Sequence, residues 1–317
     1  MWFVYVIGAS LLWALMGLAY RKCALDMTAG ERYVPIKFSI ATGVVCVPIV
    51  AICLLIREED FSIWESFVRF YPFTIYMFVY MIVCTISFVG NMYNEASVES
   101  PIENLDGFGL VLLSLAFVFF GKAESLWEVL TPQIIVGLAL ILIGFTVLAV
   151  IREKESRLAN HGEKKRFWQA GAGALLVPLL YSLMEAGETV VTGLSVDKTY
   201  GYELPEGDAM IILGSVYAFM TVILWLFLLV KEKKPYNPFA KGCRLMLVGA
   251  AFDNIGMGLY FFAMAINAVV TDGSLAAYPV LTMILGHIFL HEKLSWKQYV
   301  CLVLVIAGAV LIGVEMA

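Results

Sequence analysis

The stretch PQIIVGLALILIGFTVLAVI, at residues 132–151, is typical of a helix that crosses a membrane. It contains no charged residue, and its length matches the roughly 20 apolar residues that an α-helix needs to cross a bilayer. Similar apolar stretches recur along the chain. We therefore predict an all-α integral membrane protein with ten transmembrane helices, near residues 2–20, 36–56, 73–94, 101–121, 132–151, 168–190, 209–230, 245–267, 272–290 and 296–314.

The composition favours the same class. Of the 317 residues, 61% are hydrophobic and 15% are charged, whereas an ordinary soluble domain carries about 25% charged residues. The net charge is −5, and the sequence has no basic stripe. These features exclude a soluble enzyme, a nucleic-acid-binding protein and a disordered chain. The six cysteines are scattered without a Cys-x-x-Cys pair, so we expect them to form neither disulfides nor a metal site.

The distribution of Lys and Arg predicts the orientation of the chain, because these residues stay on the cytoplasmic side of a membrane. If the spans are numbered in order, 17 of the 21 Lys and Arg residues fall in loops 1–2, 5–6, 7–8 and 9–10 or within two residues of them, whereas loop 3–4 has none. The others are Arg57, Arg69, Lys122 and Lys198. We therefore expect a multi-pass protein of the cell membrane (plasma or inner membrane), with an uncleaved first span and both termini on the extracytoplasmic side.

A charged segment lies close to the middle of the chain, at residues 152–166. It is polar, it lies between two apolar stretches, and it carries no enzymatic motif. We interpret it as a solvated cytoplasmic linker that also helps to fix the topology. It divides the chain into two predicted domains of five helices each, at residues 1–151 and 167–317.

The two halves carry an internal repeat. Residues 128–148 align with residues 292–312 at a constant offset of 164 positions. The most informative identities are Glu128 with Glu292 and Gly144 with Gly308. Because each half has an odd number of spans, the second half must enter the membrane in the reverse orientation. Inverted repeats of this kind are typical of transporters that bind their substrate near the midplane of the bilayer, between the halves.

Residues 275–312 contain a proline in the ninth span, then the turn His-Glu-Lys-Leu-Ser, and then a last helix that bears glycines. This order resembles the closing segment of an EamA-type repeat, and residues 128–145 resemble its first copy. The chain is thus similar to the drug/metabolite transporter superfamily along its whole length. It departs from the pattern at His291, where the family usually has Gly, and in the first copy, which lacks the proline of span 4. The resemblance implies a secondary transporter of small metabolites or drugs, often working by proton or substrate exchange.

Polar residues within the spans are the candidates for function, because an ionisable residue inside a membrane is costly and usually faces a cavity. Asp253 lies near the centre of span 8. Gly256, Tyr260 and Asn267 follow it at helical spacing and share its face, and Asn254 is adjacent. We predict a substrate-binding or proton-coupling role for Asp253, and substrate binding for Asn254, Tyr260 and Asn267. The alternative is a protonated or hydrogen-bonded Asp253 with a structural role.

Other spans supply further candidates. In span 6, Tyr181 and Glu185 share one face, and we predict that both bind substrate. Glu185 is also a proton-coupling candidate, since a carboxyl group in low-dielectric surroundings can exchange a proton near neutral pH. Glu188 is expected nearer the outer interface. The remaining substrate-binding candidates are Asn91 and Glu95 in span 3 and Trp13 in span 1. The alternative for Trp13 is simple packing.

The chemistry of the spans favours one class of solute. No Lys or Arg lies near the centre of any span, whereas a carrier of phosphorylated solutes would be expected to place a cation against the phosphate. Carboxylates together with Trp and Tyr suit a neutral-to-cationic solute, because aromatic faces attract ammonium groups. His287 and His291 resemble half a metal site, but no third ligand is near them in the sequence. We therefore expect no metal, no other cofactor and no catalytic residue.

These observations predict a secondary active transporter that moves a small polar, neutral-to-cationic metabolite or drug by alternating access, coupled to protons or to substrate exchange. The expected partners are the substrate and the lipid bilayer, without nucleic acid, and a homodimer is the oligomer that we consider. One alternative is an intramembrane enzyme or lipid-modifying protein. Another is a channel or a receptor-like sensor.

Overall fold

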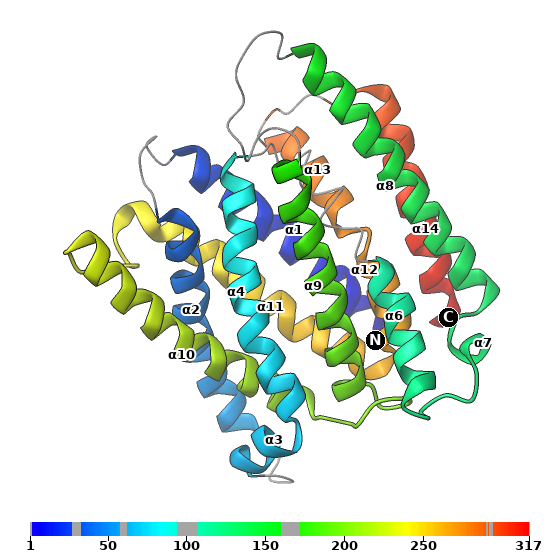
Figure 1. Cartoon of the computed structure of the whole chain (residues 1–317), viewed down its shortest axis with the longest axis horizontal. Coiled ribbons are helices and arrows are strands. Elements are labelled where there is room, and N and C mark those ends of the chain that lie inside the picture. The colour runs from blue at the N-terminus through cyan, green and yellow to red at the C-terminus, as the bar shows by residue number, and fades with distance from the viewer. Residues whose placement is uncertain are drawn as a thin grey trace.

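The computed structural model describes residues 2–26, 33–57, 62–93, 107–159, 172–289, 291 and 294–316. Within these residues all regular secondary structure is helical, which confirms the predicted all-α class (Figure 1). The first half contains α1 (Trp2–Asp26), α2 (Val34–Ile56), α3 (Ile63–Arg69), α4 (Tyr71–Tyr93), α6 (Gly107–Phe119), α7 (Leu126–Val129) and α8 (Pro132–Ala159). The second half contains α9 (Ala172–Val196), α10 (Glu206–Glu232), η2 (Lys241–Cys243), α11 (Arg244–Ile266), α12 (Ala268–Leu275), α13 (Tyr278–Phe289), α14 (Trp296–Gly313) and η3 (Val314–Met316).

The described part contains seven helices that are long and apolar enough to cross a membrane. The count becomes eight if α3 and α4, which are bent by 84° at a short break, form one span. These numbers confirm a multi-pass membrane protein. The ten predicted spans correspond to these eight together with α6 and α9, so the number ten itself remains a prediction.

Two local features differ from the sequence prediction. A short helix, α3, precedes α4, and its first turn is capped by Ser62, whose Oγ accepts the backbone N–H of Glu65 at 3.0 Å. The ninth span begins at Ala268, four residues before the predicted start, and it is broken between α12 and α13. The break has a physical reason, because Pro279 has no N–H to donate to the carbonyl of Leu275 and its ring would clash with that carbonyl.

Helices from the two halves of the chain pack against each other in pairs. The most extensively packed pairs are α1 with α11, α8 with α14 and α2 with α10, followed by α9 with both α4 and α6. The α8–α14 pair forms one side of the bundle, where the backbones meet at glycines (Figure 1). A Cβ atom at Gly308 would lie 2.5 Å from the carbonyl oxygen of Gly137, so only glycine fits there. The two chain termini lie at the same end of the bundle (Figure 1).

Candidate functional site

A cavity of about 110 Å³ lies in the interior of the bundle. Its lining side chains come from α1, α2 and α4 in the first half of the chain and from α9 to α13 in the second. Two groups of side chains dominate the lining. The acidic group comprises Glu185, Glu188, Asp253 and Asp272. The aromatic group comprises Trp13, Tyr80, Tyr181, Tyr217, Tyr260 and Tyr278. In the described part of the chain, no Lys, Arg or His side chain lines this cavity.

Hydroxyl groups from neighbouring helices hold two of the four carboxylates. The Tyr80 hydroxyl on α4 donates a hydrogen bond of 2.9 Å to Glu185 Oε1. The Tyr260 hydroxyl on α11 donates one of 3.2 Å to Glu188 Oε2. Each of these carboxylates projects from α9, so α9 is joined through the cavity to both α4 and α11.

A third bond of the same kind involves Asp272 on α12. Its Oδ1 accepts a hydrogen bond of 2.8 Å from Thr189 Oγ1, and Thr189 again belongs to α9. In each of these three hydroxyl-to-carboxylate bonds, one of the two partners belongs to α9. These three bonds join α9 to α4, α11 and α12.

Asp253 differs from the other three acidic residues. It projects from α11 into the cavity, and within the described part of the chain no hydrogen bond or ion pair joins its carboxylate to another residue. Its neighbourhood is aromatic. The ring of Trp13 lies 5.5 Å from that of Tyr260 and 5.7 Å from that of Tyr278, centroid to centroid. A carboxylate without a partner beside aromatic faces is suited to bind a positively charged group.

The ends of α9 and α12 are fixed by a buried carboxylate outside the cavity. Asp197 follows the last residue of α9, and its Oδ1 accepts the backbone N–H groups of Thr199 and Tyr200 at 2.8 and 2.7 Å. Its Oδ2 accepts the N–H of Ala268, the first residue of α12, at 2.7 Å. Burial raises the pKa of Asp197, and these backbone donors act in the opposite direction. This residue thus fixes the position of Asp272 relative to α9.

The structure brings together five of the residues predicted from the sequence, which all line the cavity: Trp13, Tyr181, Glu185, Asp253 and Tyr260. Asn254 does not line it. Its Nδ2 donates to the carbonyl oxygens of Thr42 and Ala250 at 3.1 and 2.8 Å, and its Oδ1 accepts from Cys46 Sγ at 2.7 Å, so it joins α11 to α2.

Asn267 also lies outside the cavity lining. It is the N-cap of α12, where its Oδ1 accepts the backbone N–H of Val270 at 3.0 Å. The side chain of Asn91 and the whole of Glu95 lie outside the described residues.

Several cavity residues were not expected from the sequence. Glu188 was predicted to lie near the outer interface, and Asp272 was not among the predicted site residues. Both are acidic residues within apolar stretches, so a signal for them existed. No comparable signal distinguished Tyr80, Tyr217 and Tyr278 from the other members of a set of 15 tyrosines. Among the described residues, no three His, Cys, Asp or Glu side chains are grouped so that they could hold a metal ion.

Comparison with known proteins shows which family and which fold this chain resembles. Residues 171–314 match the EamA-like transporter family. Twenty-seven chains of solved structures match this chain. One of them, described as the crystal structure of a protein, has a TM-score of 0.63 and a sequence identity of 15%. The match covers 98% of this chain and 96% of the chain in that structure. That likeness shows a shared fold. No curated protein matches the sequence. Residues 171–314, nearly the whole second half of this multi-pass membrane protein, thus match the EamA-like transporter family.

Proposed function

We propose that this protein is a secondary active transporter that moves a small neutral-to-cationic solute, such as an amine or an amino acid, through the acidic cavity. The single observation that carries the proposal is the charge of the lining. Four carboxylates face one small cavity, and no cationic side chain of the described residues joins them there. Carboxylates that share low-dielectric surroundings cannot all be ionised unless a cation or protons compensate for their charge. A cationic substrate supplies that compensation.

We assign different roles to two of the carboxylates. Asp253 binds the positive group of the substrate, because its carboxylate has no partner in the described part of the chain. Glu185 couples transport to protons, because its bond to the Tyr80 hydroxyl can be kept or exchanged as the carboxyl group gains or loses a proton. Trp13, Tyr181 and Tyr260 form the aromatic wall that receives the rest of the solute.

Alternating access requires two halves that can move relative to each other, and we propose that residues 1–151 and 167–317 are these halves, with residues 152–166 as their linker. The helix pairs support this division. In an inverted repeat, α1 corresponds to α9 and α4 corresponds to α11. The pair α1–α11 therefore has the pair α9–α4 as its equivalent, and the helices of both pairs pack against each other. The starts of α1 and α9 also lie at opposite ends of the bundle (Figure 1). Inverted repeats with a site between them are a known transporter design.

The size of the cavity limits the solute. A volume of about 110 Å³ has room for about four water molecules, at about 30 Å³ for each. This space suits a small metabolite better than a large drug in the conformation described. Among the described residues that line the cavity, none is a histidine that could serve as the base for a nucleophile, so the described lining does not favour the enzyme alternative.

A thermal-shift screen of the purified protein tests the proposal. Amines, amino acids, sugars, nucleosides and sugar phosphates are compared at equal concentrations. We expect amines or amino acids to raise the melting temperature, because a ligand at about 100 times its Kd stabilises the folded state by about 2.7 kcal/mol. The variant Asp253→Asn should weaken binding by about tenfold to a hundredfold, the usual effect of losing one charge-assisted hydrogen bond.

The matched control is Glu124→Gln, which also neutralises a carboxylate but at an exposed position in the loop before α7. It should leave ligand binding unchanged. The proposal is wrong if a phosphorylated anion is the preferred ligand. It is also wrong if ligands of any class keep their effect in the Asp253→Asn, Glu185→Gln and Tyr260→Phe variants.

A further inference from the structure

The helices α2 and α10 are joined by an ion pair at each of their two ends. They pack side by side, and each comes from a different half of the chain. At one end, Arg57, directly after α2, pairs with Asp208 in the first turn of α10. At the other end, Lys37 in the first turn of α2 pairs with Glu232, the last residue of α10. The two ion pairs are separated by almost the full length of both helices.

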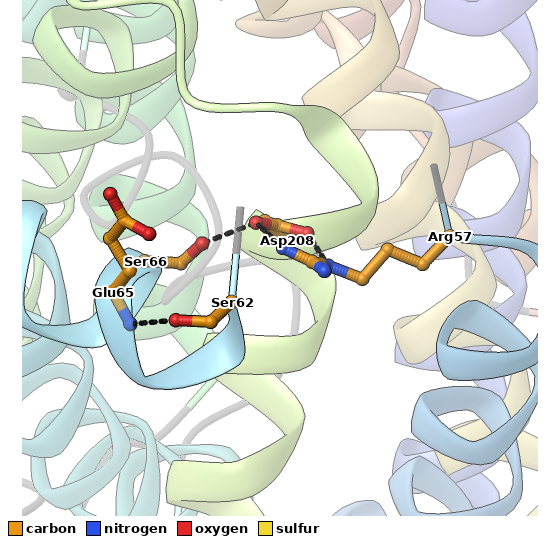
Figure 2. Close-up of polar contacts among 5 residues, drawn as sticks. All are labelled: Arg57, Ser62, Glu65, Ser66 and Asp208. Carbon is orange, nitrogen blue, oxygen red and sulfur yellow. Dashed lines mark hydrogen bonds and ion pairs between the residues drawn. The ribbon is translucent and has the colours of Figure 1, made fainter. Parts of the chain in front are cut away.

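The Arg57–Asp208 contact is the more extensive of the two (Figure 2). Arg57 Nε lies 2.6 Å from Asp208 Oδ1, and Nη2 lies 3.0 Å from Oδ2, so the guanidinium group donates a hydrogen bond to each carboxylate oxygen. Ser66 on α3 donates a further hydrogen bond to Oδ2. Figure 2 shows Asp208 between Arg57 and Ser66. The side chains of Arg57 and Asp208 are only 13% and 4% exposed. Two residues of the first half thus hold one residue of the second.

The opposite end is held more loosely. Lys37 Nζ lies 3.3 Å from Glu232 Oε1, and the Glu232 side chain is 28% exposed. The Lys37 ammonium group also lies 5.4 Å from the centre of the Tyr236 ring. A lysine is a point charge, without the planar two-pronged geometry of arginine. The two ends are therefore unequal, and the end at Arg57 is the more firmly closed.

Between the two ion pairs, the helices touch through glycines. A Cβ atom at Gly43 on α2 would lie 2.7 Å from the backbone oxygen of Tyr217 on α10. A Cβ atom at Gly214 on α10 would overlap a side-chain carbon of Val50 on α2. The middle of the pair is thus in backbone contact, while its ends are held by polar groups that water can replace. Tilting about this contact would separate one end and keep the other closed.

We propose that the two ion pairs are the gates of the transporter. The Arg57–Asp208 pair closes the cavity toward the end of the bundle that carries the termini, and the Lys37–Glu232 pair closes it toward the opposite end. Opening toward one side breaks the pair on that side while the other pair holds. This inference rests on the proposed function, because gates require alternating access.

Cys84 provides a reporter inside the protein, since it lines the cavity. The experiment uses the full chain with the other five cysteines replaced by serine, reconstituted in vesicles whose orientation is read from a tag at the N-terminus. A membrane-impermeant maleimide is added to one side or the other, and the rate of Cys84 labelling is measured. No substrate is needed, so failure of the gate is distinguishable from failure of the proposed substrate class.

We expect Arg57→Gln to increase labelling severalfold from the side of the termini and to decrease it from the opposite side. Lys37→Gln should have the reverse effect. The charge swap Arg57→Asp with Asp208→Arg should restore the original rates. Ser66→Ala removes only one hydrogen bond, so it should change labelling in the same direction as Arg57→Gln but less. This variant also tests the gate if Arg57→Gln prevents folding.

The matched control is Lys198→Gln. Lys198 pairs with Glu206 at 2.5 Å at the same end of α10, but both residues belong to the second half of the chain. Breaking that pair should leave labelling from either side unchanged. The proposal is overturned if neither Arg57→Gln nor Ser66→Ala changes the labelling, if labelling rises equally from both sides, or if the charge swap fails to restore it. Unchanged labelling would mean that the ion pairs hold α2 and α10 together as a static unit, and an equal rise from both sides would mean that the substitutions loosen the bundle as a whole.

Discussion

Two adjacent residues of α11 have different roles, because one faces the cavity and the other packs against α2. Asp253 projects into the cavity, whereas Asn254 is buried against α2. Successive side chains on an α-helix point about 100° apart, so neighbours in the sequence face different surroundings. Tyr260, two turns after Asp253, lines the same cavity. The polar stripe on this helix is therefore real, but Asn254 lies beside it and serves the packing of α11 on α2.

The variant Asn254→Ala tests this division of roles. It removes both donors and the acceptor that contact Thr42, Ala250 and Cys46, and it leaves buried polar groups unpaired. We expect a loss of stability of about 1–3 kcal/mol, the usual cost of an unsatisfied buried group. The affinity for the ligand found in the thermal-shift screen should change much less than in Asp253→Asn. A larger loss of affinity than of stability would instead assign Asn254 to the binding site.

The position of a residue along a span was harder to predict than its chemical type. Glu188 stood two residues from the predicted end of span 6, but α9 continues to Val196 and places this residue well inside the helix. Asp272 stood at the predicted start of span 9, but α12 begins at Ala268. The ends of these helices depend on Asp197, which caps α12 from a distant part of the chain. A contact between residues so far apart in the sequence leaves no local pattern.

At the scale of single elements, hydropathy predicted the long helices well, because the bilayer imposes their length. It missed α3, which is too short to give an apolar window, and the break between α12 and α13. Glycines in the last helix of each half are sites of close contact between α8 and α14. A Cβ atom at Gly144 would lie 2.6 Å from a side-chain carbon of Val305 on the partner helix. The pair α8–α14 thus depends on small residues for its packing.

The variant Gly308→Ala tests this dependence. In a helix, alanine normally stabilises by about 1 kcal/mol relative to glycine. Here the new Cβ atom would lie 2.5 Å from the backbone oxygen of Gly137, so α8 and α14 must move apart. We expect a lower melting temperature, because overpacking of this kind costs about 1–3 kcal/mol. Gly242→Ala is the control, since its Cβ would meet no atom within 4 Å. An unchanged or higher melting temperature for Gly308→Ala would show that the two helices are not fixed by this contact.

At the scale of the whole molecule, the repeat in the sequence and the helix pairs in the structure lead to the same arrangement. An even number of spans places both termini on one face, and both lie at one end of the bundle (Figure 1). Which face this is depends on charge alone. Because 17 of the 21 Lys and Arg residues fall in the loops of the opposite end or within two residues of them, we expect the termini to be extracytoplasmic and residues 152–166 to be cytoplasmic.

Protease accessibility in intact cells and in inverted membrane vesicles tests this orientation. A cleavable tag is placed at the N-terminus, at the C-terminus, or within residues 152–166 in three separate versions of the chain. In intact cells with a permeable outer barrier, the protease should remove both terminal tags and spare the internal one, because the hydrocarbon core excludes the enzyme. Inverted vesicles should give the reverse pattern. Removal of only one terminal tag would require an odd number of spans, and an odd number would be incompatible with two inverted halves of equal size and with a cavity shared between them.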